Sequence, residues 1–456
     1  MTDAPDWNER YHAGFIVRFR LRLLDRPGTL AGALDAIGAL GANIGDVSLA
    51  GVEGDHKLRD VQAFLVNGEH RDRAIAALNA LDGVEVLEAI DEVLEIHRGG
   101  TIQTQHRVRL ETLMDLRMVY TPGVARVCEA IAQDPDAAWD YTAVRHKIAI
   151  VTNGTAVLGL GNIGSLAALP VMEGKAAILS RFVGVSAEPL LVESEDPSVI
   201  VETVARCAGG YGAIQLEDIA APDCFFVERE LQARLNKPVF HDDQHGTATV
   251  CVAGLKSALK RIGRRAEDCQ AVVLGSGAAG SAIARFLVQF GVGEVIMVDS
   301  AGALYDGRNE KMNDEKRALA KVTNHAKVQG SLEDVMRGRN LFVGVSRPNL
   351  IHPDMVRSMG ADPIVFALAN PVSEISIHEA QKAGAAIALD GRGMNNALAY
   401  PGIFRGALDA RAQRITPEMM LAAATALSEA AGDLLLPNML DLSVHQKVAA
   451  AVAHAV

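Results

Sequence analysis

The feature that most constrains the fold is a glycine-rich turn between two apolar stretches. The run AVVL is typical of a buried strand, and it leads into Gly275-x-Gly277-x-x-Gly280 and an amphipathic helical pattern. GEVIMVDS then indicates a second strand that ends near Asp299, 22 residues after Gly277. Such glycines let the backbone approach a pyrophosphate at a helix N-terminus, and such an acid accepts hydrogen bonds from a ribose diol. The stretch predicts a doubly wound, Rossmann-type α/β domain that binds a dinucleotide.

An earlier glycine signature, Gly159-x-Gly161-x-x-Gly164, is not followed by an acidic strand end, since AAILSRFVGV contains none. We therefore interpret it as a tight backbone turn near the substrate and assign the dinucleotide to the later signature. After Asp299 no lysine or arginine occurs until Arg308. Because a 2′-phosphate requires a nearby cation, this spacing favours NAD over NADP.

Two acidic pairs follow two short apolar runs. Glu217-Asp218 follows AIQL and Asp242-Asp243 follows PVF, and a helical pattern comes after each pair. This order places both pairs at the carboxyl ends of neighbouring strands, where open α/β sheets bind ligands. Four carboxylates brought together repel one another, and Mg²⁺ or Mn²⁺ with oxygen ligands relieves that repulsion. Either pair alone is better explained as a solvated loop end, but the two together favour a metal site.

Composition excludes several classes of protein. The 456 residues suggest about three domains. A net charge of −12 argues against nucleic acid or an anionic membrane as partner. No apolar run approaches the ~18 residues of a membrane span, and the polar start does not resemble a secretory signal. Five scattered cysteines form no metal-binding spacing, which indicates free thiols and a cytoplasmic location.

The first hundred residues predict a small separate domain. FIVRFRLRLL alternates apolar and charged residues, as a half-buried strand does. The patterns that follow give the order βαββαβ, a ferredoxin-like arrangement, with strands at 15–24, 43–52, 59–67 and 84–96 and helices at 29–40 and 70–81. Through DRPGTL and GANI, residues 12–97 resemble an ACT domain. That resemblance implies dimerisation and a small effector, often an amino acid, at a subunit interface; a module that only dimerises is the alternative.

The remaining patterns continue the α/β alternation. A polar helix is expected over 107–115, a second helix in VARVCEAIAQ, and a packing helix in SVHQKVAAAVAHAV. NLFVGVS, PIVFALANP and AAIALDG read as further buried strands. Asn370 follows one strand, and Asn395-Asn396 precede a YPG turn. Asparagines there suit a substrate carboxylate or a cofactor carboxamide, although each one alone could simply cap its loop.

From about Arg98 to the C-terminus the chain resembles a malic enzyme of the compact bacterial type. The motifs that carry this resemblance are MVYTPGVA, TNGTAVLGLGNIG, VMEGKA, LEDI, FHDDQHGTA, VLGSGAAG, ALANP and MNNALAYPG. The resemblance implies oxidation of L-malate with NAD(P) and a divalent metal, followed by decarboxylation to pyruvate and CO₂. It also implies an N-terminal catalytic domain over 98–245 and an NAD-binding domain over 246–456.

The resemblance further implies a role for individual residues. The metal would be held by Glu217, Asp218 and Asp243, with Asp242 beside a general base, Lys175, and Tyr120 as general acid. Asn370 together with Asn396, or its neighbour Asn395, would contact substrate, and Asn370 also the cofactor. This chain departs from the family in a short segment at 390–394 and in Ala156, where larger members place a malate-binding arginine.

Oxidation and decarboxylation of a 2-hydroxy acid independently require a general base and a proton donor. Removing a hydroxyl proton near neutral pH needs a base, and a lysine serves only if its pKa is lowered from about 10.4. The enolate left after decarboxylation must be protonated at C3, and Tyr120 is the candidate donor. Outside their motifs, Tyr120 would be a core tyrosine beside a turn and Lys175 a surface helix lysine.

Two other functions remain open at this point. The same fold could oxidise another 2-hydroxy diacid or only decarboxylate oxaloacetate. A catalytically lost dinucleotide sensor is the third hypothesis, against which the intact set of acids, lysine and tyrosine argues. We expect a homodimer or higher oligomer, in which the Tyr120 and Lys175 segments could meet across a subunit boundary.

Overall fold

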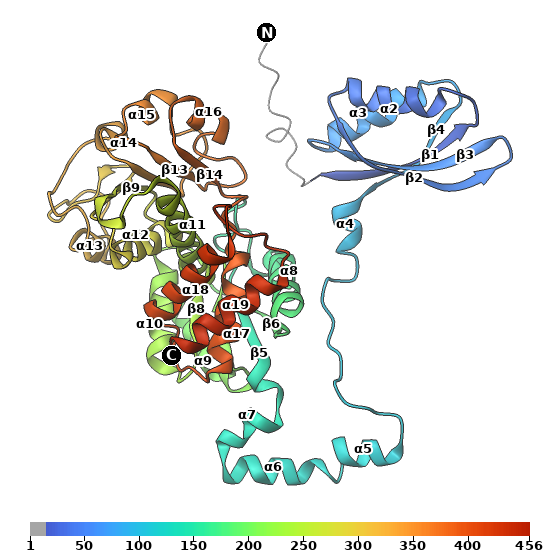
Figure 1. Ribbon diagram of the computed structural model, residues 1–456. Helices are drawn as coiled ribbons and strands as arrows, with labels where there is room; N and C mark the ends of the chain where they lie inside the picture. Colours follow the sequence, from blue (N-terminus) through green and yellow to red (C-terminus); the bar gives the residue numbers. More distant parts are fainter. Residues whose placement is uncertain (1–14) are drawn as a thin grey trace. The chain divides into compact units, whose positions relative to one another are not determined.

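The computed structural model describes residues 15–456 and divides into two compact units, the first ending at Gln103 and the second spanning Thr104–Val456 (Figure 1). Residues 12–14 of the expected N-terminal domain lie outside the described part, as does most of the polar start that argued against a secretory signal. Among the described residues, no helix has the length and apolarity needed to cross a membrane.

The first unit is an antiparallel sheet covered by two helices. Along the chain it contains β1 (Ile16–Leu24), α2 (Thr29–Ala39), β2 (Asn43–Glu53), β3 (His56–Phe64), α3 (Gly68–Asn79) and β4 (Val84–Asp91). The strand order β2-β3-β1-β4 confirms the predicted ferredoxin-like arrangement. Alternate β1 residues such as Phe19 and Leu21 are buried with Ile37 of α2 and Leu78 of α3.

The last strand of this unit is shorter than its sequence suggests. The strand expected over 84–96 ends at Asp91, and α4 (Glu92–Ile96) follows. The Asp91 carboxylate accepts hydrogen bonds from the backbone N–H groups of Val93 and Leu94, so it caps a helix at the point where pairing with β1 stops.

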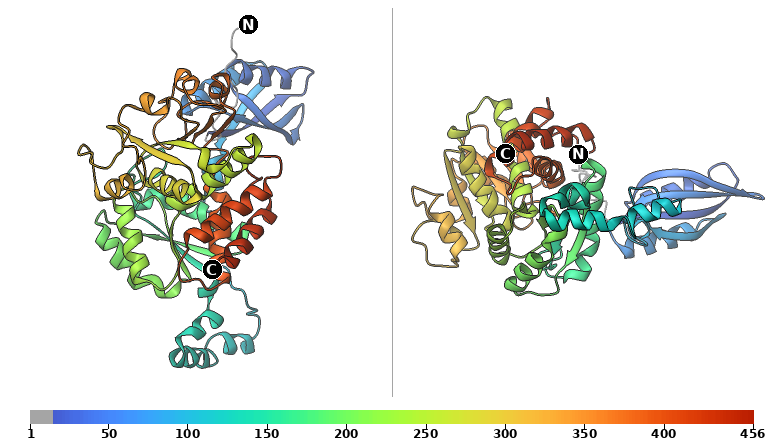
Figure 2. Two further views of the ribbon diagram at one scale, coloured as in Figure 1. Left: turned by 60° about the vertical axis from the view of Figure 1, so that its left-hand side comes forward. Right: turned by 90° about the horizontal axis from the view of Figure 1, so that it is seen from below.

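The second unit begins with an arm of helices, α5 (Leu113–Val119), α6 (Val124–Gln133) and α7 (Ala138–Tyr141), which have no buried residues. The helix expected over 107–115 begins only at Leu113, because Thr112 and Asp115 form a reciprocal capping box there. The helix expected in VARVCEAIAQ is confirmed as α6. Figures 1 and 2 show α5 and α6 standing apart from the sheets of this unit.

The first sheet of this unit is parallel, in the order β6-β5-β7-β8. Its strands are β5 (Lys147–Thr152), β6 (Ser186–Leu191), β7 (Ala213–Leu216) and β8 (Val239–His241), and its helices are α8 (Ser165–Val183), α9 (Pro197–Cys207) and α10 (Asp223–Arg234). The earlier glycine signature forms a tight turn, in which Val157 bridges Gly161, at the start of α8. That part of its interpretation is confirmed.

The second sheet is the predicted doubly wound one, in the order β11-β10-β9-β12-β13-β14, parallel except for the short β11. Its strands are β9 (Gln270–Leu274), β10 (Glu294–Asp299), β11 (Gly302–Ala303), β12 (Leu341–Gly344), β13 (Ile364–Ala367) and β14 (Ile387–Asp390). The helices are α12 (Ala278–Phe290), α13 (Asp314–Ala320), α14 (Leu332–Met336), α15 (Pro353–Arg357) and α16 (Ile377–Lys382). A Cβ on Gly280 would lie 2.0 Å from the Gly275 carbonyl oxygen, so α12 can approach β9 only with glycine there.

Four further helices pack between and around the two sheets. They are α11 (Thr247–Ile262), α17 (Tyr400–Asp409), α18 (Pro417–Ala430) and α19 (Leu442–His454). Helix α11 contacts α12 and α18, while α17 and α19 contact each other and α8 of the first sheet. The C-terminal packing helix is thus confirmed, and residues beyond 400 pack against α8 of the first sheet.

Candidate active site

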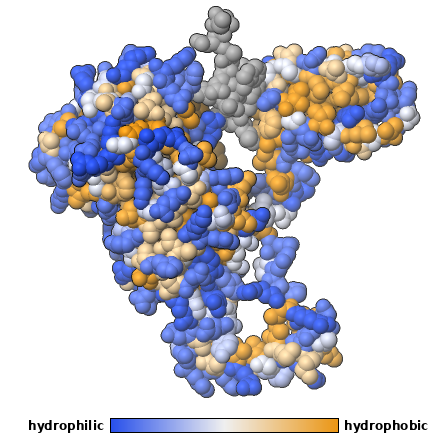
Figure 3. Space-filling model, viewed as in Figure 1, coloured by the Kyte–Doolittle hydropathy of each residue, from blue (hydrophilic) through white to orange (hydrophobic). Residues whose placement is uncertain are grey.

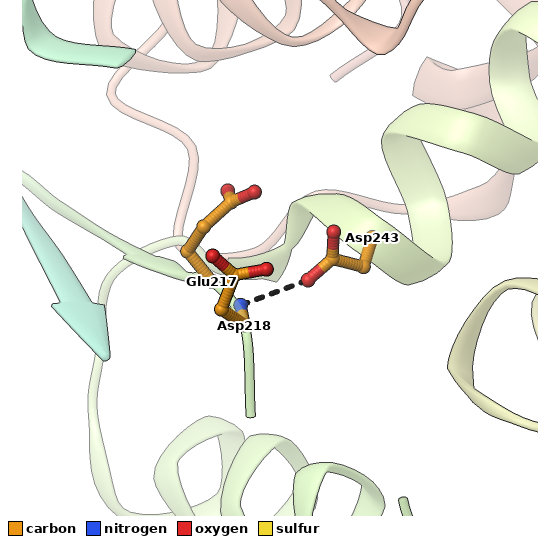
Figure 4. A group of neighbouring side chains, drawn as sticks. All are labelled: Glu217, Asp218 and Asp243. Atoms are coloured by element: carbon orange, nitrogen blue, oxygen red, sulfur yellow. Dashed lines mark hydrogen bonds between the residues drawn. The ribbon is translucent and has the colours of Figure 1, made fainter. Parts of the chain in front are cut away.

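The two acidic pairs come together as the sequence predicts. Strands β7 and β8 are parallel neighbours; Glu217 and Asp218 follow the first, and Asp242 and Asp243 begin a π-helical turn, Asp242–Gly246, after the second. The backbone N–H of Asp218 donates to Asp243 Oδ2 at 2.9 Å (Figure 4). A Cβ on Gly246 would lie 1.9 Å from Asp242 Oδ1, so the turn can close over Asp242 only with glycine at this position.

Three of these acids form a cluster suited to a metal ion. Oxygen atoms of Glu217, Asp218 and Asp243 all lie within 4.8 Å of one another. Burial, with the charge of Asp243, raises the pKa of Glu217 to about 7 and that of Asp218 to about 8, while Lys175 opposes the shift. Asp218 Oδ2 is buried without a hydrogen-bond partner. An unsatisfied oxygen among three crowded carboxylates fits a hard divalent cation, which prefers oxygen ligands.

Lys175, on α8, points into the same cluster. Its Nζ donates to Asp242 Oδ2 at 2.5 Å and lies 3.1 Å from Glu217 Oε1. Burial lowers the pKa of Lys175, but Asp242 and Glu217 outweigh that effect and hold it well above the usual value. A general base would need a lysine with a lowered pKa. The protein's own groups instead raise the pKa of Lys175, because two carboxylates that are distant in the sequence surround it.

Sequence reasoning missed Tyr400. Its ring lies under Lys175 Nζ at 4.7 Å, and its side chain is fully buried. A cation over an aromatic face is stabilised by the ring quadrupole, so Tyr400 helps to hold the ammonium in place. In the sequence Tyr400 stands out only as the first residue of the YPG motif. No local pattern indicates that its ring lies against Lys175 on α8.

The predicted dinucleotide site lies at the start of α12. Gly277 is exposed with open space around its Cα, and no side chain caps the helix. Asp299 ends β10 as expected, but both its oxygens accept hydrogen bonds from Arg308, and Lys316 Nζ donates to Oδ2 at 2.7 Å. These bonds outweigh burial and lower the pKa of Asp299 to about 2. The expectation that no cation lies near Asp299 is thus wrong. The chain after β10 folds back and brings Arg308 and Lys316 to this carboxylate.

The three asparagines differ in their surroundings. Asn395 accepts a hydrogen bond from the Ala397 N–H at 2.9 Å, so it caps its loop. Asn396 lies beside the acidic turn, its Cβ 3.3 Å from where a Cβ of Gly246 would stand. Asn370 follows β13, and its Nδ2 donates to the Leu368 carbonyl at 3.4 Å. Asn395 thus caps its own loop, whereas Asn396 lies beside the turn that carries Asp242 and Asp243.

Tyr120 is not brought to the cluster within this chain. Tyr120 directly follows α5 and is 66% exposed, and its side chain makes no hydrogen bond or ring contact within the described residues. A role for Tyr120 as proton donor therefore requires that its hydroxyl meet a Lys175 cluster other than that of the same chain.

A doubly wound dinucleotide-binding sheet, together with three carboxylates clustered at the end of a second parallel sheet and a largely buried helix lysine beside them, defines the class of metal-dependent α/β dehydrogenases. Comparison with known proteins narrows the class. The family described as malic enzyme, N-terminal domain, matches residues 100–195, and malic enzyme, NAD binding domain, matches 244–392 and 390–456. The chain belongs to the malic enzyme family.

Individual relatives of the chain are also malic enzymes. The bifunctional malic/malolactic enzyme of Bacillus subtilis is 46% identical over 378 residues, covering 80% of this chain and 92% of that protein. The NAD-dependent malic enzyme of Geobacillus stearothermophilus is 42% identical over 431 residues, covering 92% and 90%. The crystal structure of the NAD-dependent malic enzyme of Thermotoga maritima matches with a TM-score of 0.77 at 40% identity, covering 80% and 99%. The resemblance to malic enzymes inferred from the motifs is confirmed, and the resemblance of residues 12–97 to an ACT domain stays a prediction.

Proposed function

We propose that the Lys175–Asp242 pair, held against Glu217, Asp218 and Asp243, is the catalytic centre of a malic enzyme. The reaction is the oxidative decarboxylation of L-malate to pyruvate and CO₂ with reduction of NAD, and it depends on a divalent metal. The observation that carries the residue assignment is the 2.5 Å contact of Lys175 Nζ with Asp242 beside three clustered acids. The division at residue 245 between catalytic and NAD-binding parts belongs to the same proposal.

In this proposal the chain's own groups move the protons. Lys175, in its neutral form, takes the proton of the malate 2-hydroxyl at Nζ as hydride leaves C2, giving oxaloacetate. The C3–C4 bond then breaks, CO₂ departs, and Tyr120 gives its hydroxyl proton to C3. Asp242 keeps Nζ oriented toward the substrate, and Asn396 is placed to contact the substrate carboxylate.

Two bound groups complete this chemistry. Glu217, Asp218 and Asp243 would hold a divalent cation, which would supply polarisation of the C2 oxygen and stabilisation of the enolate charge, and a bound nicotinamide would supply the hydride acceptor. The positive charge of such a cation also opposes the carboxylates that raise the pKa of Lys175, which favours the neutral lysine. Gly275, Gly277 and Gly280 would receive the dinucleotide, with Asp299 and Asn370 as further contacts.

The exposed arm supports a site shared between two copies of the chain. Figure 3 shows hydrophobic patches on the surface of the arm. Leu113, Met114, Met118 and Tyr120 are each more than 60% exposed there. A second exposed apolar group, comprising Leu158, Leu160, Leu166 and Val171, lies on the glycine turn and on α8, the helix that carries Lys175. Burial of both groups in a homodimer would bring Tyr120 of one copy near Lys175 of the other.

The first unit supports regulation by a small effector. A cavity of about 330 Å³ is lined by residues 23–30, Lys57 and Arg59, at the DRPG turn between β1 and α2. Gly28 has φ of 91°, a conformation that favours glycine and exposes the N-terminus of α2 to the cavity. A module that only dimerises would not need this cavity.

The decisive experiment follows NADH formation with L-malate, Mn²⁺ and either NAD or NADP, and then measures pyruvate, lactate and CO₂. We expect NADH and pyruvate in equal amounts, with NAD preferred. NADH without pyruvate would make the protein a simple dehydrogenase and remove the role of Tyr120. Lactate without net NADH would indicate a malolactic reaction, and no turnover with tight NAD binding would revive the sensor hypothesis.

A further inference from the structure

A buried carboxylate outside the metal cluster ties down the turn that carries Asp242 and Asp243. Glu228 lies on α10, in the core behind the sheet edge, and is only 6% exposed. Its Oε1 accepts a hydrogen bond from the backbone N–H of His241 at 2.9 Å. Its Oε2 lies 2.9 Å from His245 Nε2 and accepts from Gln244 Nε2 at 3.2 Å. The three groups that it holds stand on both sides of the acidic pair.

The acidic turn needs such an external support. Asp242 and Asp243 occupy a five-residue π-type turn, a geometry that is rare and less well hydrogen-bonded than an α-helix. Their carboxylates are also crowded against Glu217 and Asp218, which is unfavourable whenever these groups are charged. The side chain of His241 supplies no hydrogen bond to the turn, since its Nδ1 lies 3.7 Å from Asp243 Oδ2, beyond hydrogen-bond distance, and its Nε2 has no hydrogen-bond partner. Glu228 is the side chain that links the beginning of the turn to its end.

We infer that Glu228 is a positioning residue that sets the affinity and geometry of the metal site by holding the Asp242–Gly246 turn against α10. This inference rests on the proposed metal role of Asp243. Groups behind metal ligands typically change metal affinity 10–100-fold when they are altered, because they orient the ligands without touching the metal.

The test is the variant Glu228→Gln, which keeps the size of the side chain. It loses the charge and presents an amide N–H₂ to two other N–H donors, those of Gln244 and His245. We expect the Kd for Mn²⁺, measured by calorimetry without substrate, to rise on the order of 10–100-fold. At saturating Mn²⁺ we expect the kcat of the variant to approach that of the wild type. The substitution should instead raise the Mn²⁺ concentration needed for half-maximal activity. NADH affinity and cooperative melting should be retained.

The matched control is Glu230→Gln on the same helix. Glu230 is partly exposed and lies 3.7 Å from Arg234, so its variant should bind Mn²⁺ like the wild type. If Glu228→Gln does not fold, His245→Asn removes one of the three donors and should weaken Mn²⁺ binding to a smaller extent. A folded variant of Glu228 or His245 with unchanged Mn²⁺ affinity would overturn the inference. Asp243→Asn, measured in parallel, separates the two failures: if it too binds Mn²⁺ normally, the metal assignment itself is wrong.

Discussion

At the scale of single residues, the site is governed by charges that no local pattern displays. Lys175 and Asp299 are each surrounded by opposite charges from distant parts of the chain, Lys175 by β7 and β8 ends and Asp299 by Arg308 and Lys316. In both cases the sequence named the residue, but the structure shows partners that change its chemistry. Substitutions here should act on binding and protonation more than on folding.

Asp243→Asn tests the metal assignment. The variant keeps the shape of the side chain but loses an anionic ligand, so we expect Mn²⁺ binding to weaken by at least tenfold and turnover to fall below detection. Melting without metal should not suffer, because the removed charge repels Glu217 and Asp218. Calorimetry, steady-state rates and melting curves provide the measurement; wild-type rates in a folded variant would refute the assignment.

The raised pKa values of Glu217 and Asp218 predict a pH dependence with a definite sign. Between about pH 4, the unfolded value, and about pH 8, the folded protein holds protons that the unfolded chain releases. The free energy of unfolding without metal should therefore decrease as pH rises through this window. Mn²⁺ must displace the same protons, so its affinity should increase over that range.

Melting curves in chelator and calorimetry in buffers of different ionisation enthalpy measure both effects. Asp218→Asn is the control, because it should flatten the pH dependence of melting and reduce proton release. Mn²⁺ binding that releases no protons anywhere in the window would contradict the shifted values.

At the scale of elements, hydrophobic periodicity predicted which segments form packed helices and strands. It did not predict element boundaries that are set by a capping side chain. Helix α6 and most strands of the two sheets of the second unit follow from apolar runs and helical spacing, namely β7, β8, β9, β10, β12, β13 and β14, whereas no strand was predicted at β6 or β11. The end of β4 and the start of α5 do not follow from these patterns, since Asp91 and the Thr112–Asp115 capping box set those boundaries locally. The arm carries exposed apolar residues that no part of the described chain covers, as do the glycine turn and α8.

A complementation experiment tests whether that arm serves a second copy. Tyr120→Phe lacks the proton donor, and Lys175→Arg keeps the positive charge but cannot act as a base. Each variant alone should be inactive. If the site is shared, mixed dimers contain one intact site, and an equal mixture should regain about a quarter of wild-type activity. Mixing each inactive variant with itself is the control; an inactive mixture with proven subunit exchange would place Tyr120 and Lys175 in one chain.

At the scale of the whole molecule, the chain joins a ferredoxin-like unit to a malic enzyme body. If the first unit regulates the second, a chain that starts at Arg98 should retain malate oxidation but lose its response to effectors. Rates of the full and shortened chains are compared across amino acids and other small metabolites. A response that persists in the shortened chain would exclude control through the cavity at residues 23–30.

The sequence by itself determined the family, the βαββαβ unit, the dinucleotide sheet and the meeting of two acidic pairs at one sheet edge. These follow from spacing, because glycine turns, strand ends and apolar periods act over a few residues. Only the tertiary structure decided the high pKa of Lys175, the cations on Asp299, the approach of Tyr400 and the bracing of the acidic turn by Glu228. Each of these depends on which distant side chains become neighbours in a medium of low dielectric, where a single charge at hydrogen-bond distance outweighs any local preference.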